Sequence, residues 1–116
     1  MRKRKIGILG IEIRTPNINE MKKFYSIIFG TAPIESKDGV FFEDNGVSLI
    51  KTNNALILKE KNISLMFYTD DVSGIYKQLA ENGFHVQIIP PKNQAAVNSL
   101  RIKDVDGNDV SLIEIK

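Results

Sequence analysis

The tetrapeptide Val-Ser-Leu-Ile stands at residues 47–50 and again at 110–113, each time after a turn-forming run of Asp, Asn and Gly. A second match lies upstream of each copy: Thr-Pro-Asn-Ile at 15–18 and Thr-Asp-Asp-Val at 69–72 are 54 residues apart. Both matches occur after the same order of predicted elements in the two halves of the chain. The sequence therefore predicts an internal duplication, and this duplication decides the fold.

The first half begins with a strand predicted over residues 6–14, where apolar residues alternate with polar residues or glycine. A helix is predicted to start at Asn17, with Glu20 completing a capping box, and to end at Gly30. Further strands are predicted at 40–43, 47–50 and, as a short segment, 56–58.

The second half repeats this order. A strand is predicted over 63–69, followed by a helix that Asp71 caps and that stops at Asn82-Gly83. Three further strands are predicted at 84–88, 100–103 and 110–115. The halves are thus two copies of a strand–helix–strand–strand–strand unit.

Each copy has about 55 residues, which is too few to bury a sufficient core alone. We therefore expect the two copies, at about 6–58 and 59–116, to pair into one domain that spans residues 1–116. Each helix is expected to cover the apolar face of a curved mixed sheet. The predicted fold class is α+β.

The composition of the 116 residues is that of one globular domain, with 42% hydrophobic and 26% charged residues. The absence of cysteine excludes disulfides, thiolate metal sites and thiol nucleophiles. The net charge is only +2, and residues 2–5 (Arg-Lys-Arg-Lys) hold much of the excess. The remainder of the chain lacks the broad basic face that a nucleic-acid binder needs. No apolar run reaches the roughly 20 residues of a membrane span or resembles a signal peptide, so we expect a cytoplasmic protein.

Three local patterns resemble the glyoxalase/bleomycin resistance/dioxygenase superfamily, also called the vicinal oxygen chelate fold. The first runs from Asn17-Ile18 through Phe24-Tyr25 to Phe29-Gly30. The second is 69–72 leading a helix to Asn82-Gly83-Phe84. The third is the run 104–108, Asp-Val-Asp-Gly-Asn, in which Val105 stands where the family usually has proline. The resemblance extends over about residues 6–115 and implies two tandem βαβββ modules, with a helix on the outer face of each sheet and a cleft on the concave face.

Enzymes of this family hold a divalent metal in that cleft with His, Gln or Glu side chains from the first and last strands of each module. The resemblance places these four positions in this chain at Gly10, Ser48, Ser64 and Ser111. Glycine offers no side-chain donor, and a neutral serine hydroxyl is a poor ligand for transition metals compared with imidazole or carboxylate. His85 is the only histidine, so a site with two histidines and a carboxylate is impossible. We therefore expect neither a metal nor another cofactor.

The alternation of strand residues selects the side chains that line the cleft. The predicted ligand-binding residues are Glu12, Arg14, Ser48, Ser64, Met66, Tyr68, Arg101 and Ser111. Five of these eight residues have a plainer interpretation. The Glu12–Arg14 pair could be a weak surface pair, Met66 and Tyr68 could serve core or dimer packing, and Arg101 could be an ordinary solvated strand residue.

The sequence predicts a metal-free protein that binds and sequesters an unidentified small molecule as a homodimer, similar to the bleomycin-resistance branch, with no catalytic residue assigned. One alternative is a metal-dependent lyase, isomerase or dioxygenase of the same superfamily, with ligands such as Glu12, His85 or Glu114. A second alternative is an interaction or regulatory module whose cleft is filled by its own side chains. No nucleic-acid or membrane partner is expected.

Overall fold

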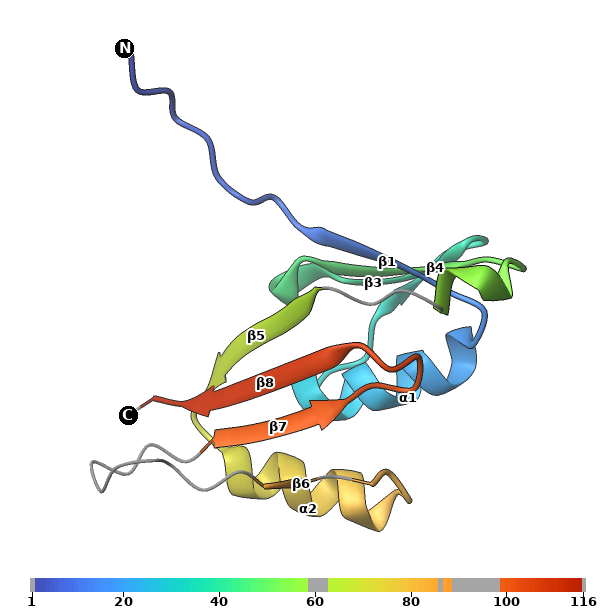
Figure 1. Ribbon diagram of the computed structural model, residues 1–116, viewed down its shortest axis with the longest axis vertical. Helices are drawn as coiled ribbons and strands as arrows, with labels where there is room; N and C mark the ends of the chain where they lie inside the picture. Colours follow the sequence, from blue (N-terminus) through green and yellow to red (C-terminus); the bar gives the residue numbers. More distant parts are fainter. Residues whose placement is uncertain (1, 59–62, 86, 89–98, 116) are drawn as a thin grey trace.

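The computed structural model describes residues 2–58, 63–85, 87–88 and 99–115, and it contains the predicted duplication (Figure 1). The elements of the first module are β1 (Ile11–Thr15), α1 (Ile18–Phe29), β2 (Ile34–Glu35), β3 (Gly39–Phe42), η1 (Glu43–Asn45), β4 (Val47–Lys51) and η2 (Ala55–Leu58). Those of the second are β5 (Ser64–Thr69), α2 (Val72–Glu81), β6 (Gln87–Ile88), β7 (Ser99–Lys103) and β8 (Asp109–Glu114).

The two modules have the same sheet topology. The strand order is β1-β4-β3-β2 in the first sheet and β5-β8-β7-β6 in the second. In each sheet the first strand pairs parallel with the last, and the other pairs are antiparallel. This repeated mixed topology confirms the predicted α+β fold of two βαβββ modules.

The helices form where the sequence predicts them. The apolar stripe of α1 is buried, and Gly30 ends this helix with a left-handed φ of 67°, a conformation that costs glycine little. Asp71 caps α2 by accepting a hydrogen bond of 2.9 Å from the N–H of Gly74. The capping box predicted for α1 is wrong: Asn17 occupies the N-cap position but makes no side-chain cap, because its amide donates to Asp106 instead.

Three strand predictions are corrected by the structure. The first strand starts at Ile11 and not at residue 6, because β4 begins only at Val47 and offers no partner further upstream. The predicted strand at 56–58 is part of the 3₁₀ helix η2. The second strand of the second module is Gln87–Ile88, whereas the sequence predicts it over 84–88, and Val86 lies outside the described residues. The strand that the sequence did not predict, β2, is only two residues long.

One hydrophobic core joins the two modules. Phe29 at the end of α1 places its ring 5.0 Å from that of Phe42 in the first sheet and 5.3 Å from that of Phe67 in the second, centroid to centroid. The helix-covered faces of both sheets therefore meet in the same interior.

Polar contacts also fasten α1 to the second module. The hydroxyl of Tyr25 donates to Asp104 Oδ2 at 2.6 Å, and the amide of Asn17 donates to Asp106 Oδ1 at 2.8 Å. Both aspartates lie in the turn between β7 and β8 and are buried. Asp104 also accepts from the backbone N–H groups of Asp106 and Asn108, so this turn is held as a structural unit. Within the described part of the chain, neither helix has the length and apolar character that crossing a membrane requires.

Candidate functional site

Each sheet has one face covered by helices and one that is not, and the predicted site residues lie on the uncovered faces. We call the uncovered face of the first sheet the first face and that of the second sheet the second face. The strand register defines both. The first face comprises Glu12, Arg14, Ile34, Phe41, Ser48 and Ile50. The second comprises Ser64, Met66, Tyr68, Ser99, Arg101, Lys103, Asp109, Ser111 and Ile113.

On the first face, a row of paired residues crosses the sheet. Glu12 pairs with Ser48, and Ser48 pairs with Phe41. Glu12 Oε1 lies 3.5 Å from Arg14 Nε, and both side chains are more than half exposed. Such a pair contributes little to stability, so the two charges remain available to a polar ligand.

On the second face, Met66, Ser111 and Arg101 form a continuous row across β5, β8 and β7. Met66 is 68% exposed and Tyr68 is 77% exposed. Arg101 points away from the core, as expected from the burial of its neighbours Leu100 and Ile102. The face thus combines adaptable apolar surface with a hydroxyl and a guanidinium group.

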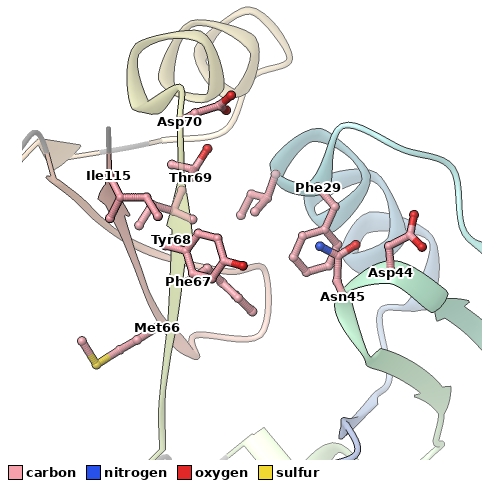
Figure 2. A pocket seen from close by; sticks show the side chains of 11 residues that line it. Phe29, Asp44, Asn45, Met66, Phe67, Tyr68, Thr69, Asp70 and Ile115 are labelled. Carbon is pink, nitrogen blue, oxygen red and sulfur yellow. The ribbon is translucent and has the colours of Figure 1, made fainter.

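A cavity of about 650 Å³ lies beside β5, between the two modules (Figure 2). Figure 2 shows Phe29, Asp44 and Asn45 on one side of it and the residues of β5, with Asp70, on the other. Its lining residues are Ile28, Phe29, Asp44, Asn45, Met66, Phe67, Tyr68, Thr69, Asp70, Leu112 and Ile115. The volume falls within the range of sites for small ligands.

The cavity brings together only part of the predicted set. Met66 and Tyr68 line it, whereas Glu12, Arg14, Ser48, Ser64, Arg101 and Ser111 do not. The sequence does not predict Phe29, Asp44, Asn45 or Asp70 as residues of the site. These residues come from α1, η1 and the end of β5, and no local pattern indicates that the fold juxtaposes them.

At the four positions that the resemblance assigns to metal ligands, the chain offers a glycine and three serine hydroxyls. A Cβ atom at Gly10 would lie 2.7 Å from the carbonyl oxygen of Gly46. A side chain at this position would therefore require the backbone to shift. Among the described residues, no group of three His, Asp or Glu side chains is placed to share a metal ion. The donor set therefore does not fit the divalent metal that the fold implies.

The alternative ligands fit no better. Glu114 lies on the helix-covered side of β8, where its Oε1 accepts a hydrogen bond of 3.1 Å from the N–H of Val72. His85 is exposed in the connection before β6. Neither belongs to the face that holds Glu12.

A comparison with models of protein families identifies the class of protein that has this fold. The model of the Glyoxalase/Bleomycin resistance protein/Dioxygenase superfamily matches residues 7–112, so the chain belongs to this superfamily. A search of curated proteins found no match.

Solved structures share the fold at low sequence identity. FosX, a genomically encoded fosfomycin resistance protein from Listeria monocytogenes, superposes with a TM-score of 0.73 at 17% identity, over 97% of this chain and 96% of that chain. TnmS3, an antibiotic binding protein from Streptomyces sp. CB03234, gives 0.61 at 21% identity, over 99% and 100%. An integron cassette protein from V. cholerae gives 0.66 at 22% identity, over 99% and 100%. At these identities the likeness concerns the fold alone.

Proposed function

We propose that this protein is a metal-free, small-molecule-binding member of the superfamily that sequesters its ligand as a homodimer in the cytoplasm. The observation that carries the proposal is the donor set: one glycine and three serines stand where a metal enzyme of this family needs imidazole, amide or carboxylate groups. Stoichiometric binding needs no such donors. It needs a concave apolar surface with a few convergent polar groups.

The open faces and the cavity beside β5 supply such a surface. Met66 and Tyr68 belong to both the second face and the cavity, so we assign them the central contacts with the apolar body of the ligand. Arg101, Ser64 and Ser111 on the second face, and Glu12, Arg14 and Ser48 on the first, are the proposed polar contacts. Two of the similar folds belong to proteins named for antibiotic binding and fosfomycin resistance, which agrees with this role.

Binding is tested by a thermal-shift screen of amphipathic small molecules, antibiotics included, followed by calorimetry on each hit. A ligand raises the melting temperature because it binds the folded state. We expect a saturable hit with a fixed stoichiometry, and we expect Tyr68→Ala to weaken it at least tenfold. Tyr76→Ala, which truncates a tyrosine on α2 away from both faces, should leave the affinity unchanged. A broad screen without a saturable hit would favour an interaction module.

The metal-free part of the proposal has its own measurement. Elemental analysis of protein purified without chelators should find less than a tenth of an equivalent of any transition metal per chain. One tightly bound equivalent of zinc, nickel, iron or manganese would instead support the metal-dependent lyase, isomerase or dioxygenase.

A further inference from the structure

A second cavity, of about 490 Å³, lies between the last turn of α1 and the helix α2. It adjoins the cavity beside β5, and the residues common to both linings are Ile28, Phe29, Thr69 and Asp70. In Figure 2, Asp70 and Phe29 stand on opposite sides of the first cavity. None of the residues that we assign to the ligand of the open faces lines the second cavity. The proposed function therefore leaves this cavity unused.

The floor of the second cavity is apolar. Ile28 and Ile75 are each 7% exposed and belong to the core, and Ile27 and Phe29 pack against that core. The wall is open at Gly30, where an added Cβ atom would meet no other atom within 4 Å. An apolar floor, an open wall and a volume of this size are typical of a site for a small molecule.

The positive end of α2, which borders the cavity, is already neutralised by two carboxylates. The N–H of Val72 donates to Glu114 Oε1 at 3.1 Å, and the N–H of Gly74 donates to Asp71 Oδ1 at 2.9 Å. These N–H groups are the donors that would otherwise attract an anion to a helix start. The cavity therefore does not favour an anionic ligand.

The negative end of α1 has no such compensation from its own helix. The N–H groups of Gly30 and Thr31 both donate to the carbonyl oxygen of Ser26. The last carbonyl groups of a helix have no partner within the helix and carry its partial negative charge. The last turn of α1 contains no basic residue, and residues 27–30 line the cavity. This end of the cavity therefore favours a positively charged group.

The charged side chains around the cavity reinforce this preference. Asp70, Asp71 and Glu81 line it, against one basic residue, Lys77. Within the described part of the chain, neither Asp70 nor Glu81 takes part in an ion pair. Both carboxylates are therefore available to a cationic ligand.

We propose that the second cavity binds a small organic amine, in which a compact apolar body carries a primary ammonium group. The apolar body lies on Ile28, Phe29 and Ile75. The ammonium group, which has three donors and no acceptor, meets the carbonyl end of α1 and the carboxylates of the wall. This site goes beyond the proposed function, because the ligand of the open faces contacts other residues.

The ligand class is tested with probes that share a phenyl body and differ in charge: phenethylamine, phenethyl alcohol and hydrocinnamate. Each is titrated into the protein while two-dimensional NMR spectra record the backbone amides. We expect the amine to shift the signals of Gly30 and Gly74 saturably, with a dissociation constant at least tenfold below that of the alcohol. Hydrocinnamate should not bind, and added salt should weaken the amine. Equal affinities for amine and alcohol, or no saturable shift with the amine, would overturn the proposal.

The location is tested with the double variant Asp70→Asn/Glu81→Gln, which removes two charges at nearly constant side-chain volume. Both residues are exposed, so the variant should keep its circular dichroism spectrum. We expect its dissociation constant for phenethylamine to rise at least tenfold. The matched control is Glu20→Gln/Asp38→Asn, which removes the same charges from exposed positions outside the cavity and should bind normally. An unchanged affinity in the first variant, or equal losses in both, contradicts the inference.

Tyr68→Ala separates this site from that of the open faces, because Tyr68 lines the first cavity and not the second. This variant should bind phenethylamine as tightly as the wild type. A loss of affinity would place the amine in the cavity beside β5 and overturn the inference. If the broad ligand screen fails while the amine binds between the helices, the sequestering function falls and the second site stands.

Discussion

The Tyr25 hydroxyl is buried between two modules and donates to Asp104. Burial, followed by the negative charge of Asp104, raises the pKa of this phenol well above its ordinary value. The native state therefore keeps the proton that makes the hydrogen bond. In the unfolded chain the same phenol ionises near its ordinary pKa of about 10.

This difference predicts a loss of stability at alkaline pH. A pKa that is higher in the folded state stabilises fully below the unfolded pKa and progressively less above it. Above about pH 10, Tyr25 alone should lower the free energy of unfolding by about 1.4 kcal/mol per pH unit. The free energy of unfolding of Tyr25→Phe should not show this additional decrease above about pH 10. Urea denaturation of both proteins between pH 8 and pH 11 measures it, and identical pH dependences would contradict the assignment.

At the scale of elements, the two helix starts look alike in sequence but differ in structure. Asp71 caps α2 through the N–H of Gly74, whereas the amide of Asn17 leaves its own helix and binds Asp106. The same position in the duplicated unit thus has a local role in one copy and a tertiary role in the other. The chemical reason is that an amide carries donors that a carboxylate lacks.

Asp71→Ala should therefore destabilise the protein by about 1 kcal/mol, the usual cost of losing a cap. Asp70→Ala is the matched control: the neighbouring aspartate is exposed, and its removal should change the free energy of unfolding by less than about 0.5 kcal/mol. Chemical denaturation at one protein concentration compares them. Equal losses would show that the helix start does not depend on the Asp71 cap.

On the scale of the whole molecule, Phe29 connects both sheets through its ring contacts with Phe42 and Phe67. Because one core serves both modules, we expect them to unfold together. Two modules of this size would each bury too little surface to be stable alone. Cooperative unfolding is thus a consequence of the shared core and not of either module.

Phe29→Ala should cost about 2–4 kcal/mol, since it removes aromatic contacts with both sheets at a partly buried site. Tyr76→Ala, a truncation of an exposed ring on α2, should cost less than about 1 kcal/mol. Thermal unfolding followed by circular dichroism should show one transition for each protein. Two separate transitions in the wild type would contradict a single core.

The sequence by itself determined the duplication, the buried stripe of each helix and the residues that share a sheet face. It also determined the order of the elements, except for β2 and the segment 56–58. All of these depend on local periodicity, which side-chain geometry fixes at 3.6 residues in helices and two in strands. It also determined the weak donors at Gly10, Ser48, Ser64 and Ser111, because the identity of a residue sets which donor atoms it can offer to a metal.

Only the tertiary structure decided where β1 begins, what Asn17 binds and which residues surround the cavity. The first strand starts at Ile11 because its partner starts at Val47, and Asn17 meets a turn that lies 89 residues along the chain. The cavity also depends on distant segments, because residues of α1, η1 and β5 line it together. Each of these outcomes depends on which distant segment comes into contact, and local patterns carry no information about that.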